Sequence, residues 1–313
     1  MADKGPEPAT YWPDLPYAQW RDSAATLHMW TQIVGKIRMV RSPWMNHSWH
    51  VTLYVTPRGM TTGTIPHGNR TFSIEFDFID HELVVSSCEG DVAGVALEPQ
   101  ATAEFYRAVM QSLDRLGLSV AINTLPNEVE NAIRFPEDRL HSAYDAEAVN
   151  RFWRVLYQVD RVLRSFRADF RGKASPVHFF WGSFDLAVTR FSGRTAPDHP
   201  GGLPNMPLWV AQEAYSHEVS SAGFWPGGDN FPEAVFYSYA YPSPPRFAEA
   251  PVKPAEAFWS SEFGEFMLPY DAVRTANDPK DALLAFLNST FNAAASLGDW
   301  NLDAYTQRHF PPK

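Results

Sequence analysis

Apolar side chains recur every three or four positions in three long segments of the chain, and this spacing is typical of a helix with one buried face. The segments are 17–41, 101–116 and 145–170. A fourth helix is predicted over 282–297, where a capping residue and a first-turn proline precede the periodic run. The sequence therefore predicts several long amphipathic helices.

Apolar and polar positions alternate in the stretches between these helices, which is the pattern of half-buried strands. The predicted strands cover 48–56, 71–79, 83–87, 93–97 and 118–123, and later 177–181, 183–189, 215–224 and 234–241. Turn-forming residues separate many of these strands, so neighbours are expected to pair antiparallel. The predicted fold class is α+β, with antiparallel β-sheets flanked by long amphipathic helices.

The order helix, strands, helix occurs twice and predicts two similar halves. We expect an N-terminal α+β half over 17–135 and a C-terminal α+β half over 136–313, packed together as one compact unit. Four prolines within 1–16 disfavour a helix, so these residues are expected to form an extended N-terminal arm. The loop at 196–210 is rich in proline and glycine, and long loops of this kind often act as lids.

Composition excludes some partners. The 313 residues carry a formal net charge of -10, whereas nucleic acids and anionic membranes attract basic surfaces. The single cysteine, Cys88, cannot form an internal disulfide, which fits a reducing cytoplasm. The sequence shows neither a signal peptide nor an apolar run long enough to span a membrane. We expect a cytoplasmic protein whose partner is a small molecule, with no nucleic acid and no membrane, and the oligomeric state stays open.

Reactive side chains gather near the middle of the chain among many aromatic residues. His178 and Asp185 lie on two predicted strands separated by Gly182, which favours a bend, so their side chains are expected to converge. His217 and Glu218 are adjacent in a later strand and therefore point to opposite faces. Buried imidazoles and carboxylates have to be paired, neutralised or bound to a metal. A hydrogen-bonded pair of His178 and Asp185 that joins two strands is the simplest interpretation.

Two imidazoles and a carboxylate also suit Zn or Fe, with one coordination position left open for water or substrate. We predict His178, Asp185 and His217 as metal ligands, and Glu218 and Asp185 as catalytic carboxylates that move a proton. No nucleotide or flavin motif is present, so hydrolysis is preferred over oxidation. The predicted function is a metal-dependent enzyme, a hydrolase rather than an oxidoreductase, that acts on a small organic molecule.

Aromatic residues near these groups support an alternative function. Phe180, Trp181 and Trp225 are predicted to line an apolar pocket. His50 and Tyr54 lie on the polar face of the first predicted strand, which can border the same cleft. A non-catalytic small-molecule-binding protein with an aromatic-lined pocket is therefore the alternative to an enzyme. A structural protein whose aromatic residues all belong to the core is a third interpretation.

A polar stripe follows the first predicted helix. His28, Gln32 and Lys36 lie four residues apart and so share one face of it. Such a stripe either lines a cleft or faces solvent, and a solvated face is favoured.

Five runs of the sequence resemble a bacterial family that is catalogued only as a domain of unknown function. They are TLHMWTQIVGKIRM, HVTLYVTPRGMTTG, SPVHFFWGSFDLAVTRFSGR, YSHEVSSAGFWPGG and GEFMLPYDAVRTANDP, and they extend over nearly the whole chain. The family carries no assigned activity or catalytic residue. The resemblance therefore implies only a soluble, cytoplasmic, bacterial protein.

Overall fold

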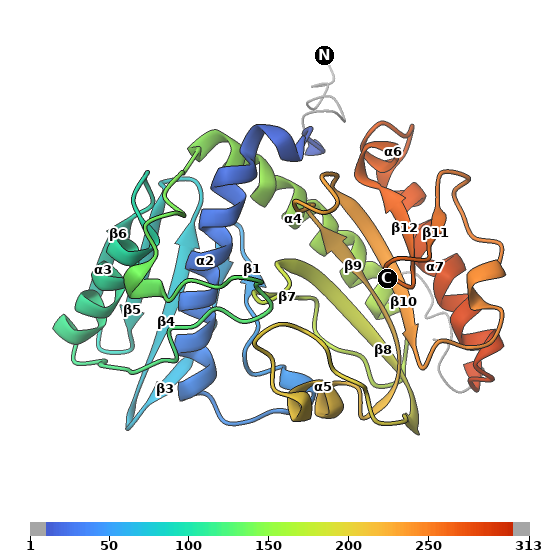
Figure 1. Cartoon of the computed structure of the whole chain (residues 1–313), viewed down its shortest axis with the longest axis horizontal. Coiled ribbons are helices and arrows are strands. Elements are labelled where there is room, and N and C mark those ends of the chain that lie inside the picture. Colours follow the sequence, from blue (N-terminus) through green and yellow to red (C-terminus); the bar gives the residue numbers. More distant parts are fainter. Residues whose placement is uncertain (1–10, 303–313) are drawn as a thin grey trace, which may run out of the picture.

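Two antiparallel β-sheets with helices packed between and behind them make up the protein (Figure 1). The computed structural model describes residues 11–302, and residues 1–10 of the predicted arm lie outside that range. The α+β prediction is confirmed. None of the described helices is both apolar enough and long enough to cross a membrane.

The N-terminal sheet has six strands and is covered by two helices. Its strands are β1 (Tyr54–Val55), β2 (Gly59–Thr61), β3 (Ile65–His67), β4 (Arg70–Asp77), β5 (Glu82–Ser87) and β6 (Val92–Ala96). They follow the order β1-β2-β4-β5-β6, with β3 also beside β4. Helices α2 (Tyr17–Arg41) and α3 (Thr102–Arg115) pack against this sheet and against each other. Figure 1 shows α2, in blue, lying across the front of the sheet.

The C-terminal sheet also has six strands. They are β7 (His178–Phe180), β8 (Asp185–Thr195), β9 (His217–Trp225), β10 (Val235–Tyr241), β11 (Phe258–Ser260) and β12 (Glu265–Pro269), in the order β11-β12-β10-β9-β8-β7. The long helices α4 (Ala146–Ala168) and α7 (Pro279–Leu297) pack against it. The short elements are α5 (Leu208–Ala214), α6 (Tyr270–Arg274) and three 3-10 turns, η1 (Asn46–Ser48), η2 (Phe135–Glu137) and η3 (Phe247–Glu249).

The cross-strand register shows which side chains lie on each of the two faces of the C-terminal sheet. Phe224 of β9 pairs with Leu186 of β8 and with Phe236 of β10, so these apolar side chains share the face that α4 and α7 cover. The residues that alternate with them point the other way and define what we call the open face. The open face carries His178, Phe180, Asp185, Phe191, Trp225, Tyr237, Tyr239 and Glu265.

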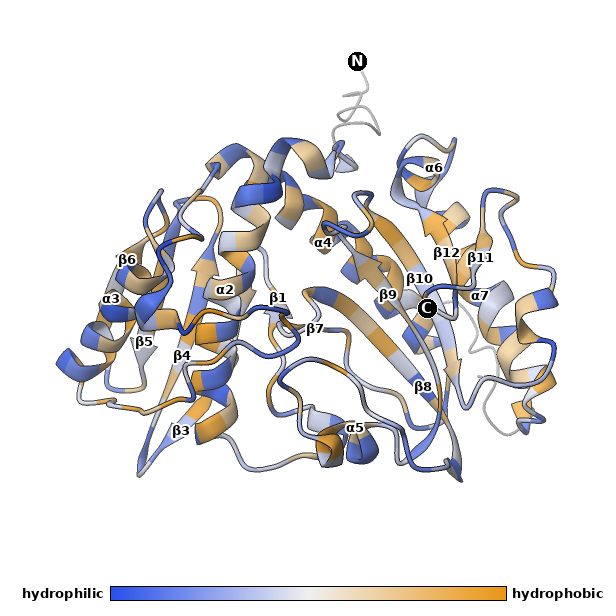
Figure 2. Ribbon diagram, viewed as in Figure 1, coloured by the Kyte–Doolittle hydropathy of each residue, from blue (hydrophilic) through white to orange (hydrophobic). Residues whose placement is uncertain are grey.

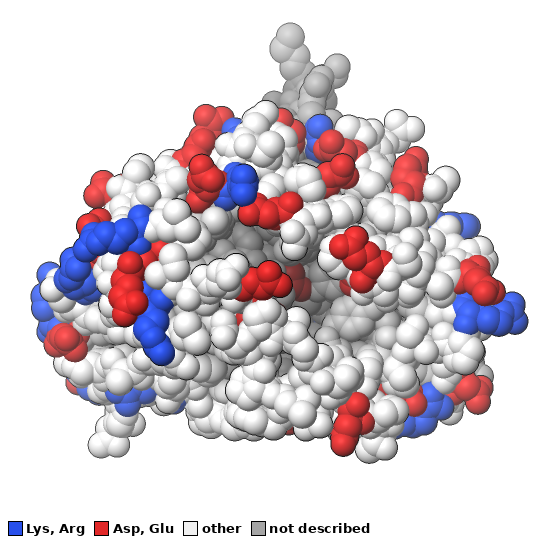
Figure 3. All heavy atoms as spheres, in the orientation of Figure 1, with Lys and Arg blue, Asp and Glu red and all other residues white. Residues whose placement is uncertain are grey.

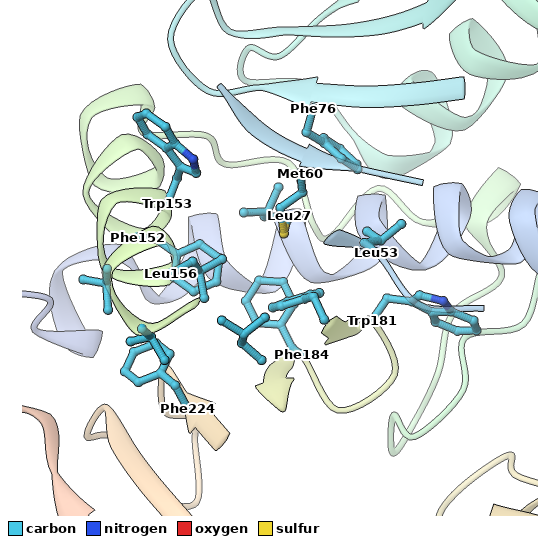
Figure 4. Packing of buried hydrophobic residues seen from close by; sticks show 14 of the residues in the cluster. Leu27, Leu53, Met60, Phe76, Phe152, Trp153, Leu156, Trp181, Phe184 and Phe224 are labelled. Atoms are coloured by element: carbon cyan, nitrogen blue, oxygen red, sulfur yellow. The ribbon is translucent and has the colours of Figure 1, made fainter. Parts of the chain in front are cut away.

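One hydrophobic core joins the two halves. In Figure 4 the packing runs from Phe76 of the N-terminal sheet through Leu27 of α2 to Phe152 of α4 and Phe224 of the C-terminal sheet. All four side chains are fully buried. Figure 2 shows the same hydrophobic colouring on the central strands and on α4. Burial of each large apolar side chain stabilises the fold by about 1.5–3 kcal/mol, so the halves stabilise each other.

The turn between β7 and β8 attaches the C-terminal sheet to the N-terminal half. Leu53 and Phe179 exchange two backbone hydrogen bonds of 2.9 and 2.8 Å. The indole Nε1 of Trp181 donates to the carbonyl of Val51 at 2.8 Å. The Trp181 ring lies so close to α2 that a Cβ at Gly35 would be 2.1 Å from it. Only glycine fits at this position of the helix.

Two of the predicted strands are wrong. Of the predicted strand 48–56, only Tyr54–Val55 is a strand, because the chain turns at Asn46–Ser48, where His47 has a positive φ of 57°. The segment 118–123 is irregular, because neither described sheet provides a strand beside it. Strands β2, β3, β11 and β12 were not predicted. The first two lie among glycine and proline residues that indicate turns, and the last two contain consecutive apolar residues instead of an alternating pattern.

Replacing Gly35 with alanine is expected to destabilise the protein by about 2 kcal/mol, because the new methyl group displaces the Trp181 ring. This steric cost exceeds the gain of about 1 kcal/mol in helix propensity. Chemical denaturation followed by tryptophan fluorescence measures the change. Gln19→Ala, at an exposed position of the same helix, is the control, with an expected change within about 0.5 kcal/mol. A Gly35→Ala protein as stable as the wild type would contradict the tight contact.

Candidate functional site

A hollow opens on the front of the molecule between α2 and the C-terminal sheet (Figure 3). The open face of the C-terminal sheet forms its floor, since α4 and α7 cover the opposite face. Figure 3 shows acidic side chains at the rim of this hollow and inside it. The described residues place three carboxyl groups here, from Asp185, Glu128 and Glu265.

Asp185 is the first residue of β8 and lies on the floor. It is 7% exposed, and burial raises the pKa of its carboxyl. Both oxygens accept hydrogen bonds from hydroxyls: Ser183 Oγ donates to Oδ1 at 2.5 Å, and Tyr237 Oη donates to Oδ2. Hydroxyls satisfy the lone pairs of a carboxylate but do not neutralise its charge. Asp185 is therefore fixed in position, and no lysine or arginine among residues 11–302 forms an ion pair with it.

The polar stripe of α2 holds the loop that carries the second carboxyl. Gln32 is fully buried, and its side-chain amide exchanges two hydrogen bonds of 2.8 Å with the backbone of Asn127. Lys36, 1% exposed, donates to the Asn127 side chain. His28 Nε2 donates to the carbonyl of Gly182 at 2.8 Å. The expectation that this stripe faces solvent is wrong, because its side chains clamp the loop and the β7–β8 turn against α2.

Glu128 follows Asn127 in the chain, and its side chain projects beside the β7–β8 turn. A Cβ at Gly182 would lie 2.0 Å from Glu128 Oε1, so the turn and the carboxyl are in direct contact. The backbone N–H of Glu128 donates to the carbonyl of Pro204 at 2.8 Å, which ties the long loop before α5 to the same place. Burial, and then the charge of Asp185, raise the pKa of Glu128 from 4.5 to about 7.

Glu265 provides the third carboxyl from β12. Burial, and then the charge of Asp185, raise its pKa from 4.5 to about 8. Tyr239 lies between β9 and β12 on the same face, and its hydroxyl contacts that of Tyr215 at 2.8 Å. The pKa of Tyr215 is raised to about 12 by burial, with the three carboxyls adding to the shift. The three acids therefore share one electrostatic environment although they come from three separate elements.

Aromatic rings surround the carboxyl groups. Phe180 of β7 pairs directly with Asp185. The ring of Tyr237 stacks with that of Tyr239 at 6.1 Å between centroids. The proline- and glycine-rich loop 196–210 reaches this region, where His199 stacks on Tyr215 at 4.5 Å. The loop is thus one wall of the hollow in this structure.

The structure does not bring the predicted metal ligands together. His178 and Asp185 share the open face on adjacent strands, as predicted, but they are not hydrogen-bonded to each other in the described structure. His217 pairs with Thr195, at the other end of β8, about 30 Å along the strand from Asp185. Within residues 11–302, no group of three His, Cys, Asp or Glu side chains could hold a metal ion.

The predicted catalytic carboxylate Glu218 lies outside the hollow. It accepts hydrogen bonds from Ser192 Oγ at 2.8 Å and from Arg194 Nη2 at 2.7 Å. A carboxylate held in an ion pair of this kind is a poor candidate to move a proton at Asp185. Its neighbour His217 instead contacts the ring of His47, 5.8 Å away.

The predicted ligand-binding residues divide between two places. Phe180 and Trp225 are on the open face. Trp181 is 5% exposed and packs on α2, so its role is structural. His50 is 3% exposed and packs on Trp44, while the ring of Tyr54 stacks under the guanidinium of Arg38. Of these two, His50 lies in the turn that follows η1 and only Tyr54 lies in a strand, β1, so they are not on one strand face as predicted.

Sequence reasoning missed Glu128, Glu265 and the tyrosines of β10. The tyrosines had a signal, since Tyr237 and Tyr239 alternate with apolar residues in the predicted strand 234–241. Glu128 had none, because it lies in an irregular segment far in sequence from the groups it approaches. Glu265 begins a strand in which Phe266, Met267 and Leu268 follow one another, so no alternating pattern marked it.

A separate hollow of about 380 Å³ lies beside α3. Its two charged lining residues, Arg107 and Asp114, are both exposed to solvent. Functional sites tend to gather ionisable groups whose pKa is strongly shifted by burial and by each other. We therefore place the candidate site at the three carboxyls rather than in this depression.

Glu128→Gln is expected to stabilise the protein at pH 8 by about 3 kcal/mol, because the amide has no charge to bury. The folded-state pKa of about 7 lies above the unfolded value of 4.5, so ionisation costs stability as the pH rises from about 4.5 through 7. The gain should vanish at pH 4, where both states are protonated. Thermal unfolding at both pH values measures it, with the exposed neighbour Glu130→Gln as the control. Equal gains at both pH values would contradict the electrostatic origin.

Comparison with known proteins identifies one family. The model of a family of unknown function (DUF5996) matches residues 12–307 of the 313. The resemblance to an uncharacterised family over nearly the whole chain is thereby confirmed. No curated protein matches the chain, and no solved structure matches it.

Proposed function

We propose that this protein, which belongs to the DUF5996 family of unknown function, binds a small organic cation on the open face of its C-terminal sheet. Asp185, Glu128 and Glu265 would hold the positive group, and the surrounding rings would hold the rest of the molecule. Of the predicted functions, this one corresponds to the small-molecule-binding protein with an aromatic-lined pocket.

The single observation that carries the proposal is the shared, uncompensated charge of the three carboxyls. Among residues 11–302, none of them forms an ion pair with a lysine or arginine. The charge of Asp185 raises the pKa of both Glu128 and Glu265, which means that the ionised groups repel one another. A bound cation removes this repulsion and replaces the lost hydration.

The spacing of the carboxyls supports an organic cation rather than a bare metal ion. A metal ion requires oxygen ligands within about 2–2.6 Å, and the described side chains do not meet that condition here. An ammonium or guanidinium group on a carbon chain can donate hydrogen bonds to carboxyls that are farther apart. The faces of Tyr237 and Tyr239 add favourable contacts with such a cation.

Isothermal titration calorimetry with putrescine, agmatine and choline is expected to detect binding, whereas the uncharged 1,4-butanediol and the anionic succinate should not bind. Asp185→Asn should weaken binding about 10- to 100-fold, the effect of losing one charged hydrogen-bond acceptor. Affinity should rise from pH 6 to pH 8.5, because Glu128 and Glu265 lose their protons with pKa values of about 7 and about 8.

The matched control is Glu262→Gln, an exposed residue on the hairpin that carries Glu265. It should leave the affinity unchanged. Equal binding of putrescine and 1,4-butanediol would reject the cation site. Tight binding of Zn²⁺ alone that is lost in His178→Ala would favour the predicted metal-dependent enzyme instead.

Acid–base catalysis is a second candidate function, favoured by the pKa of Glu128 near 7 beside the fixed carboxyl of Asp185. A carboxyl with such a pKa can both hold and release a proton at neutral pH. Hydrolysis of a small organic molecule, and the cytoplasmic location, remain predictions. If the site is catalytic, Glu128→Gln should lower the turnover of a hydrolysed substrate at least 100-fold while cation binding changes less.

A further inference from the structure

A second polar cluster lies at the other end of β8 from Asp185. It contains Lys173, whose carbonyl accepts a hydrogen bond from the Phe191 backbone N–H of β8 at 3.0 Å. His47 of η1 and Glu213 of α5 complete it, and His47 N–H donates to Glu213 Oε1 at 2.8 Å. The proposed cation site uses none of these residues.

The tautomer of His47 follows from its hydrogen bonds. Nδ1 lies 2.9 Å from the backbone carbonyl of Ala214, which can only accept, so Nδ1 carries the proton. Nε2 of the neutral ring therefore has a free lone pair. Nε2 lies 2.5 Å from Lys173 Nζ and accepts a hydrogen bond from it. The amine of Lys173 is thus held against a base.

Lys173 is exposed to solvent, but its Nζ turns inward over two rings. It lies 4.7 Å from the centroid of Phe191 and 5.5 Å from that of Trp49. His47 is held in the left-handed region with a φ of 57°, a costly conformation for a residue with a side chain. The fold thus stabilises a strained histidine whose lone pair faces a reachable amine.

We propose that Lys173 is a nucleophilic amine that forms an imine with small aldehydes or ketones. The nitrogen of the free amine bonds to the carbonyl carbon. Its two protons pass, by way of His47 Nε2, to the carbonyl oxygen, and that oxygen leaves as water when the C=N bond forms. One free amine and one carbonyl compound give one imine and one water, so no oxidant or reductant is needed.

The surroundings of Lys173 shift its protonation equilibrium in opposite directions. The rings of Phe191 and Trp49 and the carboxylate of Glu213 favour the ammonium form. Burial of Nζ opposes them, and the pKa of Lys173 is lowered as a result. His217 faces His47 and, like Lys173, disfavours a positive charge on that ring. Lys173 therefore yields its free amine more readily than a fully solvated lysine does.

The chain has six lysines, and the rate of imine formation can be measured at each of them separately. The full-length protein is incubated with propanal and sodium cyanoborohydride at pH 7.5, which traps each imine as a stable secondary amine. Peptide mass spectrometry then gives the modification rate of every lysine. Lys253 and Lys280 are exposed and serve as internal references, while the buried Lys36 should not react. We expect Lys173 to react at least fivefold faster than the references.

Two variants test the role of the cluster. His47→Gln can still donate to the Ala214 carbonyl but cannot take up a proton, so the Lys173 rate should fall to that of Lys253. Glu213→Gln keeps the acceptor for the His47 N–H and removes the charge that favours the ammonium, so the rate should rise two- to threefold. If His47→Gln fails to fold, the wild-type pH profile decides, with half-maximal modification of Lys173 at a lower pH than of Lys253. A wild-type Lys173 rate within twofold of the reference rates overturns the proposal, as does an advantage that survives His47→Gln.

Discussion

The contact between α2 and the β7–β8 turn is the constraint on which the rest of the structure depends. Gly35 lets the Trp181 ring approach the helix, and His28 binds the Gly182 carbonyl on the same side of the turn. This β7–β8 turn determines where β8 begins and therefore where Asp185 lies. The same helix holds Asn127, so one element positions two of the three carboxyls.

Electrostatic repulsion between the carboxyls in the hollow destabilises the folded protein. Burying Asp185, Glu128 and Glu265 near one another costs free energy, because each resists the ionisation of the others. The apolar core that runs through both halves provides stability to offset that cost. This destabilising arrangement of buried carboxyls is the reason for the cation site proposed above.

The spacing of apolar residues was sufficient to predict the long helices and strands, but it was not sufficient to predict the candidate site. Helices α3, α4 and α7 and the strands around Phe72, Phe224 and Phe236 have many residues on one buried face, so their pattern is clear. Helix α2 has the same apolar stripe, but residues 29–38 are buried on all its faces, which the stripe did not predict. Asp185 was identified because aromatic residues surround it in the sequence itself. Glu128 joins it only because Gln32 holds the preceding residue, Asn127, and because its carboxyl contacts a turn more than 50 positions later. One sequence contains no signal for such contacts.

The site is shared between the two halves, because the loop of Glu128 is held by α2 while Asp185 and Glu265 belong to the C-terminal sheet. Neither half alone contains all three acids in their places. Binding of the proposed cation would therefore be linked thermodynamically to the joining of the halves, and its free energy would add to the stability of the entire chain. A saturating ligand would also suppress partial opening between the halves, which makes the protein more resistant to proteolysis.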